Sequence, residues 1–181
     1  MNRNSLVTKI AVTAAALSFS VLAPAATTSV INTRVDAAMT KFYAVSASHR
    51  DLAKKAAAIL VFPRITKAGV GVGGSYGEGA LEVNGKPVGY YKVTGASVGA
   101  TLGVGRRSEV ILFMTEEARD KFMNSNGWTV GADAAVAVVK GVGGDYDTET
   151  LQKPVLAFVY GEKGLIADVS LEGAKVTKLD R

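Results

Sequence analysis

The sequence of 181 residues contains no cysteine. This absence excludes disulfide cross-links, thiolate nucleophiles and thiolate metal sites. It also removes the residue on which bacterial lipoproteins carry their acyl chains. Any contact that this protein makes with a membrane is therefore expected to come from its folded surface.

Histidine is almost as scarce, because His49 is the only one. A single histidine excludes a zinc site built from several histidines and a relay with more than one histidine. Ser46, Ser48 and Asp51 lie near it, as a catalytic triad would require, but these residue types also cap the start of a helix. We expect a helix that begins near Ser48, with His49 exposed beside this cap.

Cofactor and metal sites have little support in the sequence. Residues 69–74 have the letters of a dinucleotide-binding fingerprint, but that motif needs a helix start after the glycines, and residues 75–79 have no helical character. Acidic residues at 145, 147 and 149 alternate as in a calcium loop, yet Thr150 stands where the loop needs glycine. We expect neither a cofactor nor a metal, and we interpret the acidic segment as a solvated connection.

Two carboxylate pairs leave a hydrolase open as an alternative. Glu78 with Glu82, and Glu116 with Glu117, could act as acid and base, but the sequence does not set their separation or burial. We interpret them as ordinary surface charges and expect no enzymatic activity. A buried cleft that holds two acids with shifted protonation would favour the hydrolase.

The N-terminal residues have the composition of a signal peptide. Arg3 and Lys9 precede the apolar run of residues 10–22, and residues 23–25 supply the small side chains that a signal peptidase requires. An uncleaved membrane anchor is the alternative, although the run is short for a bilayer and contains two serines. We expect cleavage after Ala25, which would leave residues 26–181 as a single periplasmic or secreted domain.

The balance of charge is mildly basic. The chain carries 21 basic and 16 acidic residues, and the loss of Arg3 and Lys9 leaves a net charge of +3. A nucleic-acid partner is not expected, because such binding is typical of clustered lysines and arginines with interleaved aromatic residues. The excess still permits weak attraction to anionic lipid if the positive charge lies on one face.

The residue pattern predicts helices first and strands afterwards. From residue 29 to about residue 60 apolar side chains recur at helical spacing, and residues 58–62 fit either the end of the second helix or the start of a strand. Beyond Pro63 glycine is frequent and apolar residues alternate with small or polar ones. Asn84-Gly85 predicts the turn of a β-hairpin, with Pro87 at a sheet edge or a bulge.

Residues 95–105 alternate between small residues, mostly glycine, and apolar residues. One face of this predicted strand is nearly bare, so another backbone can approach closely or the sheet can bend sharply. A strand at 109–114 and a helix capped by Thr115 follow, and then strands at 132–139, 155–160, 165–171 and 174–179. The predicted fold class is α+β, with N-terminal helices and one later helix packed on a strongly curved antiparallel β-sheet; closure into a barrel is left open.

Five cations fall within residues 50–67, where the only acid is Asp51. The first two lie one helical turn apart, and the apolar residues fall largely on another side of the predicted helix. Such a segment can lie on a membrane with its cations against phosphates and its apolar stripe in the boundary layer. Alternatively the apolar stripe packs on the sheet and the cations are only solvated. The candidate lipid-binding residues are Arg50, Lys54, Lys55, Arg64 and Lys67.

Several blocks of sequence occur in the order of a known family. They comprise residues 53–63 with 67–74, residues 95–103, residues 110–114 and residues 160–173. Over about residues 48–178 these blocks resemble the SYLF domain, also called the Ysc84-like family. The resemblance implies a lipid-binding module instead of an enzyme.

In animal members of that family, a lysine-bearing amphipathic segment at the start of the domain binds phosphoinositides, and fungal members also work with actin. Carried over by position, Arg50, Lys54 and Lys55 would be the headgroup contacts. Ala58 stands where animal members have another lysine, and Thr101 where glutamine is usual. The expected ligand is therefore ordinary anionic phospholipid, and actin binding does not follow. The alternative is an envelope structural or protein-interaction module that docks a partner on the bare strand face.

Overall fold

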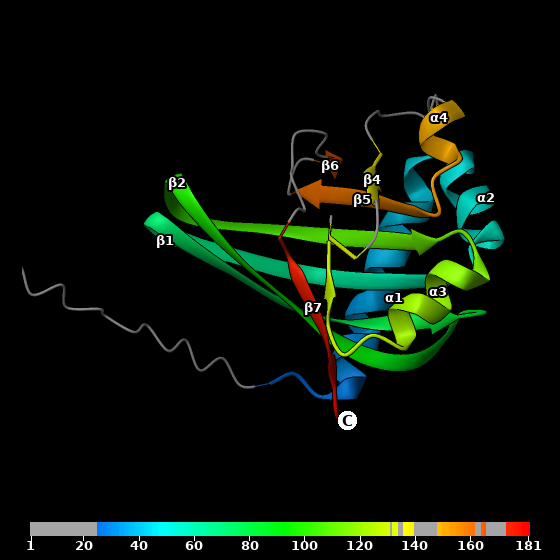
Figure 1. The fold of residues 1–181 in the computed structure, drawn as a ribbon, viewed down its shortest axis with the longest axis horizontal. Coiled ribbons are helices and arrows are strands. Elements are labelled where there is room, and N and C mark those ends of the chain that lie inside the picture. Colours follow the sequence, from blue (N-terminus) through cyan, green and yellow to red (C-terminus); the bar gives the residue numbers. More distant parts are fainter. Residues whose placement is uncertain (1–24, 131, 134–135, 140–147, 162–163, 166–172) are drawn as a thin grey trace, which may run out of the picture.

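The computed structural model describes residues 25–130, 132–133, 136–139, 148–161, 164–165 and 173–181, with side chains at 71, 97–102 and 164–165 left out. In these residues helices pack against a curled sheet, as Figure 1 shows. The helices are α1 (Thr28–Val45), α2 (Ala47–Lys55), α3 (Glu116–Met123) and α4 (Thr148–Leu151). The strands are β1 (Ala58–Val83), β2 (Lys86–Phe113), β3 (Trp128–Thr129), β4 (Val136–Val138), β5 (Val155–Gly161), β6 (Gly164–Leu165) and β7 (Lys175–Leu179).

The two N-terminal helices form where the apolar spacing predicted them. Thr27 caps α1 by accepting a hydrogen bond from the Val30 amide at 3.4 Å. The cap of the second helix lies two residues earlier than expected, at Ser46 and not Ser48, with Ser46 Oγ accepting from the His49 amide at 3.2 Å. The ambiguous residues 58–62 start β1. The face of α1 that packs on the sheet consists of Ile31, Val35, Met39 and Phe42.

The predicted hairpin at Asn84-Gly85 is confirmed. Both residues have positive φ, 52° and 71°, as a two-residue turn between twisted strands requires. The register of β1 and β2 shifts between Leu81 and Glu82, and Glu82 lies opposite Pro87. The expected bulge at this proline is therefore present, because proline cannot donate a ladder hydrogen bond.

The β1–β2 hairpin folds back on itself. A side chain at Gly77 would lie 2.7 Å from the carbonyl oxygen of Arg64, and one at Gly79 would collide with the carbonyl oxygen of Val61. In a straight strand, residues 64 and 77 would be about 40 Å apart. The hairpin turns back near the register shift between Val70 and Val72. The expected close approach of another backbone therefore occurs at Gly77 and Gly79 of β1. A side chain at Gly105 of β2 would instead have nothing within 4 Å.

The predicted α+β class with a strongly curved sheet is confirmed. The two halves of β2 have different neighbours, since residues 90–94 pair with β7 and residues 108–113 pair with β5. One pairing departs from the expected antiparallel pattern, because β4 runs parallel to β5. Of the strand expected at 132–139, residues 136–138 form β4 and residues 134–135 lie outside the described residues, as does most of the strand expected at 165–171.

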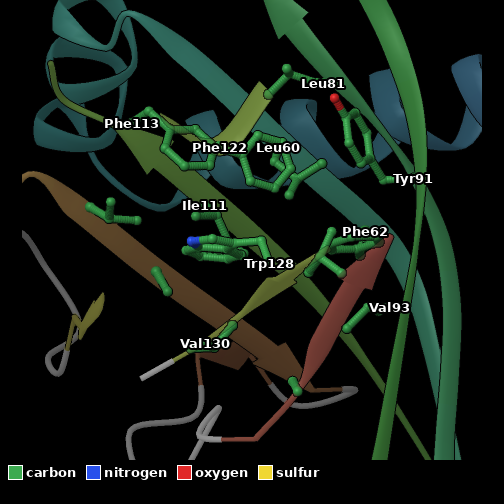
Figure 2. Packing of buried hydrophobic residues seen from close by; sticks show 14 of the residues in the cluster. Leu60, Phe62, Leu81, Tyr91, Val93, Ile111, Phe113, Phe122, Trp128 and Val130 are labelled. Atoms are coloured by element: carbon green, nitrogen blue, oxygen red, sulfur yellow. The ribbon is translucent and has the colours of Figure 1, made fainter. Parts of the chain in front are cut away.

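Two layers of apolar packing hold the sheet. Inside the curl, Phe122 of α3 meets Trp128 edge-on at 5.4 Å and Phe113 at 4.9 Å, as Figure 2 shows. Thr115 caps α3 as predicted, accepting from the Ala118 amide at 3.1 Å. On the outer side, α1 and α2 cover a second cluster that includes Val61 and Phe158. Helices α1 and α2 therefore cover the outer face of the sheet, and the inner face is filled by sheet side chains together with Phe122 of α3.

Candidate functional site

Helix α2 presents its three cations to solvent. Arg50, Lys54 and Lys55 are all exposed. The Arg50 side chain is held in place, because its Nε donates to the carbonyl oxygen of Tyr43 at 3.0 Å. Lys54 Nζ lies 3.9 Å from Asp51 Oδ1, but both side chains are well over half exposed, so this ion pair is weak. The three positive groups are thus available to an anionic surface.

The apolar side of the same helix is already occupied. His49, Leu52 and Ala53 are at most 9% exposed and lie in contact with the sheet. Of the two alternatives for this segment, the structure favours packing of the apolar stripe on the sheet. The stripe is therefore not free to enter the boundary layer of a membrane. Only the charged side of α2 can face a membrane.

The other two candidate cations lie at a distance from α2. Arg64 is exposed at the bulge between Phe62 and Ile65, next to Pro63, which has no amide hydrogen to donate. Lys67 is half-buried opposite Gly105. Nine residues of extended chain separate the start of β1 from Lys67, a span of about 30 Å. The structure therefore divides the five candidate cations into a group on α2 and a group on β1.

An exposed apolar cluster, which the sequence analysis missed, lies where the β1–β2 hairpin turns back. Val70, Val72 and Val104 are 78%, 67% and 70% exposed, and Ala68 lies directly opposite Val104. We call these four residues the hairpin tip. The middle parts of β1 and β2 extend past the other elements at the left of Figure 1. The three valines alternate with glycine in the sequence, but that pattern does not distinguish a bare buried face from a bare exposed one.

The expectation of an exposed His49 is wrong. Its side chain is fully buried and stacks on Phe42 with ring centroids 4.5 Å apart and planes 6° apart. Nδ1 lies 3.0 Å from the Phe42 carbonyl oxygen and 3.3 Å from the Tyr160 hydroxyl. Burial lowers the pKa of the imidazole, although the hydrogen bond to the backbone opposes this change. His49 therefore joins α2 to α1 and β5 as a neutral core residue.

Glu78 is also not the ordinary surface charge that we expected. Its carboxylate accepts from the Tyr76 hydroxyl at 2.7 Å and from the Ala26 amide at 3.1 Å, and it pairs with Arg181 at 2.9 Å. Burial works to raise the pKa of this carboxyl, but these hydrogen bonds together lower it below its usual value. Glu82, by contrast, has its pKa raised by burial and by Asp36.

This difference in pKa does not make Glu78 and Glu82 a catalytic pair. Residues four apart in an extended strand are separated by about 13 Å. Glycoside hydrolysis, for comparison, needs two carboxyl groups within about 5 to 9.5 Å. Glu109 is buried and is paired with Arg107 at 2.7 Å, and burial raises its pKa above the usual value although the guanidinium opposes this change. Glu78 and Glu109 are thus each held in an ion pair with an arginine, and the strand spacing keeps Glu78 and Glu82 apart.

Two of the proposed sites, the glycine-rich segment and the acidic connection, can be compared with the described part of the chain. Residues 69–74 lie within β1, which continues as a strand to Val83, so no helix follows the glycines. Within the part of the chain that the structure describes, no three histidine, aspartate or glutamate side chains are grouped to hold a metal ion. Asp145 and Asp147 lie outside that part, and Glu149 pairs with Lys153 at 3.7 Å. None of the described helices is both long and apolar enough to cross a membrane.

Comparison with known proteins supports the resemblance over the C-terminal half of the chain. Residues 94–181 match the family model Ysc84, described as "Las17-binding protein actin regulator". A search among curated proteins finds no match. The matched part begins within β2, so all five candidate cations lie before it. Over residues 94–181 the chain is thus similar to the Ysc84, or SYLF, family of binding domains.

Proposed function

We propose that this domain binds anionic phospholipid at a membrane surface and catalyses no reaction. The observation that carries the proposal is the arrangement of α2, in which Arg50, Lys54 and Lys55 are exposed while the opposite side of the helix is fixed in the core. A helix held in this way presents its positive charges on a rigid support. Arg64 and Lys67 would add contacts along β1.

The contribution of electrostatic attraction to the binding free energy can be estimated from the number of cations. A lysine or arginine close to an anionic membrane contributes about 1 kcal/mol, so the three cations of α2 together correspond to about a hundredfold in affinity. This attraction is screened by salt, because the Debye length falls from about 10 Å at 0.1 M to about 3 Å at 1 M. Binding by α2 should therefore weaken steeply as salt is raised.

Vesicle flotation tests the proposal. Vesicles of phosphatidylcholine with 30% phosphatidylglycerol should carry the protein upward at low salt, and vesicles of phosphatidylcholine alone should not. The Arg50→Gln/Lys54→Gln/Lys55→Gln variant should lose about a hundredfold in affinity for the anionic vesicles. Because Arg50 also bonds to Tyr43, the Lys54→Gln/Lys55→Gln variant, which leaves that bond intact, should lose about thirtyfold.

A matched control removes the same charge elsewhere. Lys86, Lys121 and Lys178 are exposed outside the candidate site, and changing all three to glutamine lowers the net charge equally. If this control loses as much affinity as the α2 variant, only net charge matters and the site is wrong. A protein partner, of the kind that the family description names, is the alternative function. It would be favoured if the unmodified protein does not float with anionic vesicles at any salt concentration.

The proposal includes the cellular location of the protein. Export guided by residues 1–25, with cleavage after Ala25, would bring the domain to the periplasm or the medium, where ordinary anionic phospholipids are present. The measurement is the intact mass of the protein recovered from periplasm and medium after expression in a bacterium. A chain that keeps residues 1–25, or that stays in the cytoplasm, would contradict this part of the proposal.

A further inference from the structure

The hairpin tip exposes apolar side chains where a folded domain usually buries them. Val70, Val72 and Val104 are each at least 67% exposed, although valine is among the residues most often buried. They are not scattered, because Val70 follows Ala68 on the same face of β1 and Ala68 lies opposite Val104. The tip also projects beyond the rest of the sheet in Figure 1. A cluster of this kind marks a surface that is covered by something else.

The charges around the tip indicate what covers it. Residues 58–77 of β1 and 93–108 of β2 contain four cations and no acidic residue. Arg107 is committed to Glu109, but Arg106 is exposed two residues from Val104, and Lys67 is next to Ala68. A second copy of the same tip would bring like charges together. An anionic lipid surface instead offers phosphates for the cations and an apolar boundary for the valines.

The backbone of the tip limits how deep it can enter. Among the described residues, the two strands are paired only with each other near residues 68–72 and 103–105, since β5 and β7 join β2 at residues 108–113 and 90–94. The outer edges of such a ribbon carry peptide groups that need water, so the hydrocarbon centre is closed to it. The headgroup and acyl boundary, about 5 to 10 Å deep, accepts apolar side chains while the edges stay hydrated.

We infer that the hairpin tip inserts Val70, Val72 and Val104 into the boundary layer of an anionic bilayer, with Lys67 and Arg106 against phosphate groups. This inference rests on the proposed function and adds the apolar element that α2 lacks, because the apolar side of α2 is buried. In this arrangement the tip is a contact with the bilayer separate from α2, which lies at the opposite end of the sheet in Figure 1.

Conservative substitutions test the insertion. The Val70→Thr/Val72→Thr/Val104→Thr variant keeps the shape and the strand preference of valine but replaces a methyl by a hydroxyl on each side chain. It should lose at least tenfold in affinity for vesicles with 30% phosphatidylglycerol, including at high salt, where electrostatic attraction is screened. Val88, 47% exposed near the hairpin turn, provides the matched control, and Val88→Thr should change the affinity by less than twofold.

A fluorescence measurement keeps the test independent of overall affinity. A Val104→Trp variant should shift its emission to the blue on binding these vesicles and be quenched by lipids brominated near the headgroup end of the acyl chain. Trp128 is 2% exposed in the core and supplies a constant background. All variants carry the same residues 1–25, so any lipid contact of that segment is common to them.

Three results would contradict the insertion of the hairpin tip, and they differ in what they imply for the proposed function. If the α2 variant loses binding while the threonine variant binds like the unmodified protein and the tip tryptophan of the Val104→Trp variant is not quenched, the tip inference is wrong and the proposed function stands. If the unmodified protein does not bind anionic vesicles, both fail. If the threonine variant changes the oligomeric state in the absence of lipid, as measured by sedimentation, the tip serves contact between copies of the chain and the insertion is again wrong.

Discussion

Arg181 Nη2 lies 2.9 Å from Glu78 Oε1, an ion pair between two residues 103 positions apart. Both side chains are mostly buried, at 18% and 9% exposed. The same arginine donates to the carbonyl oxygen of Ala26, whose amide donates to Glu78 at 3.1 Å. One carboxylate therefore holds together the segment before α1, the last part of β1 and the segment after β7.

Replacing Glu78 by glutamine should destabilise the protein and change its response to acid. The carboxylate has a lowered pKa in the folded state, so its contribution to stability is present above the ordinary glutamate pKa and is lost as pH falls through the folded value. We expect a loss of about 1–3 kcal/mol at pH 7 for Glu78→Gln and a smaller difference from the unmodified protein below about pH 4. Urea unfolding between pH 3 and 8 measures both, and a constant difference over this range would contradict the assignment. Glu117→Gln, on an exposed helix end, should cost about 0.5 kcal/mol at pH 7.

Cleavage after Ala25 should strengthen the contact with Glu78. The backbone amide of Ala26 would become an ammonium group beside the carboxylate, and a charge-assisted hydrogen bond is about twice as strong as a neutral one. A chain with two extra residues before Ala26 moves the ammonium away and should unfold at a lower temperature. In Glu78→Gln the two chains should differ less. Equal melting temperatures of the two chains in the unmodified background would show that the ammonium does not reach Glu78.

His49 should make the protein less stable in mild acid. Its folded pKa lies below the ordinary value of about 6.5, so stability is complete above that pH and falls as pH drops toward the folded pKa, by at most about 1.4 kcal/mol per pH unit. His49→Gln should flatten the dependence on pH between 5 and 7, whatever it does to absolute stability. An unchanged slope in the urea midpoints over this window would show that other groups are responsible.

Gly79 should not tolerate a side chain. A Cβ there would meet the Val61 carbonyl oxygen, which cannot move without displacing the backbone of β1. We expect Gly79→Ala to cost about 1–3 kcal/mol, as overpacked sites do. Gly105→Ala is the matched control, since a Cβ at that position would have nothing within 4 Å, and it should be neutral or slightly stabilising. Comparable losses in both variants, measured by thermal unfolding, would mean that the folded hairpin does not bring its two halves into contact.

Local features of the fold could be predicted because they depend on neighbouring residues. The Asn84-Gly85 turn, the Thr115 cap and the α1 face each follow from spacing or side-chain chemistry within a few positions. The beginning of α2 was misplaced because Ser46 and Ser48 are both good caps. The folding back of the hairpin could not be predicted, because contacts between residues 61–65 and 77–79 depend on how the strand bends.

The sequence by itself determined the α+β class, the family resemblance and the positive charge of residues 50–67, because composition, periodicity and ordered motifs are local properties. Only the tertiary structure decided which side of α2 is buried, that His49 is a core residue, and that Glu78 binds Arg181. It also decided that three valines between glycines are exposed at a tip. Burial is a property of the whole packed chain, and a strand pattern states which residues share a face without stating what covers that face.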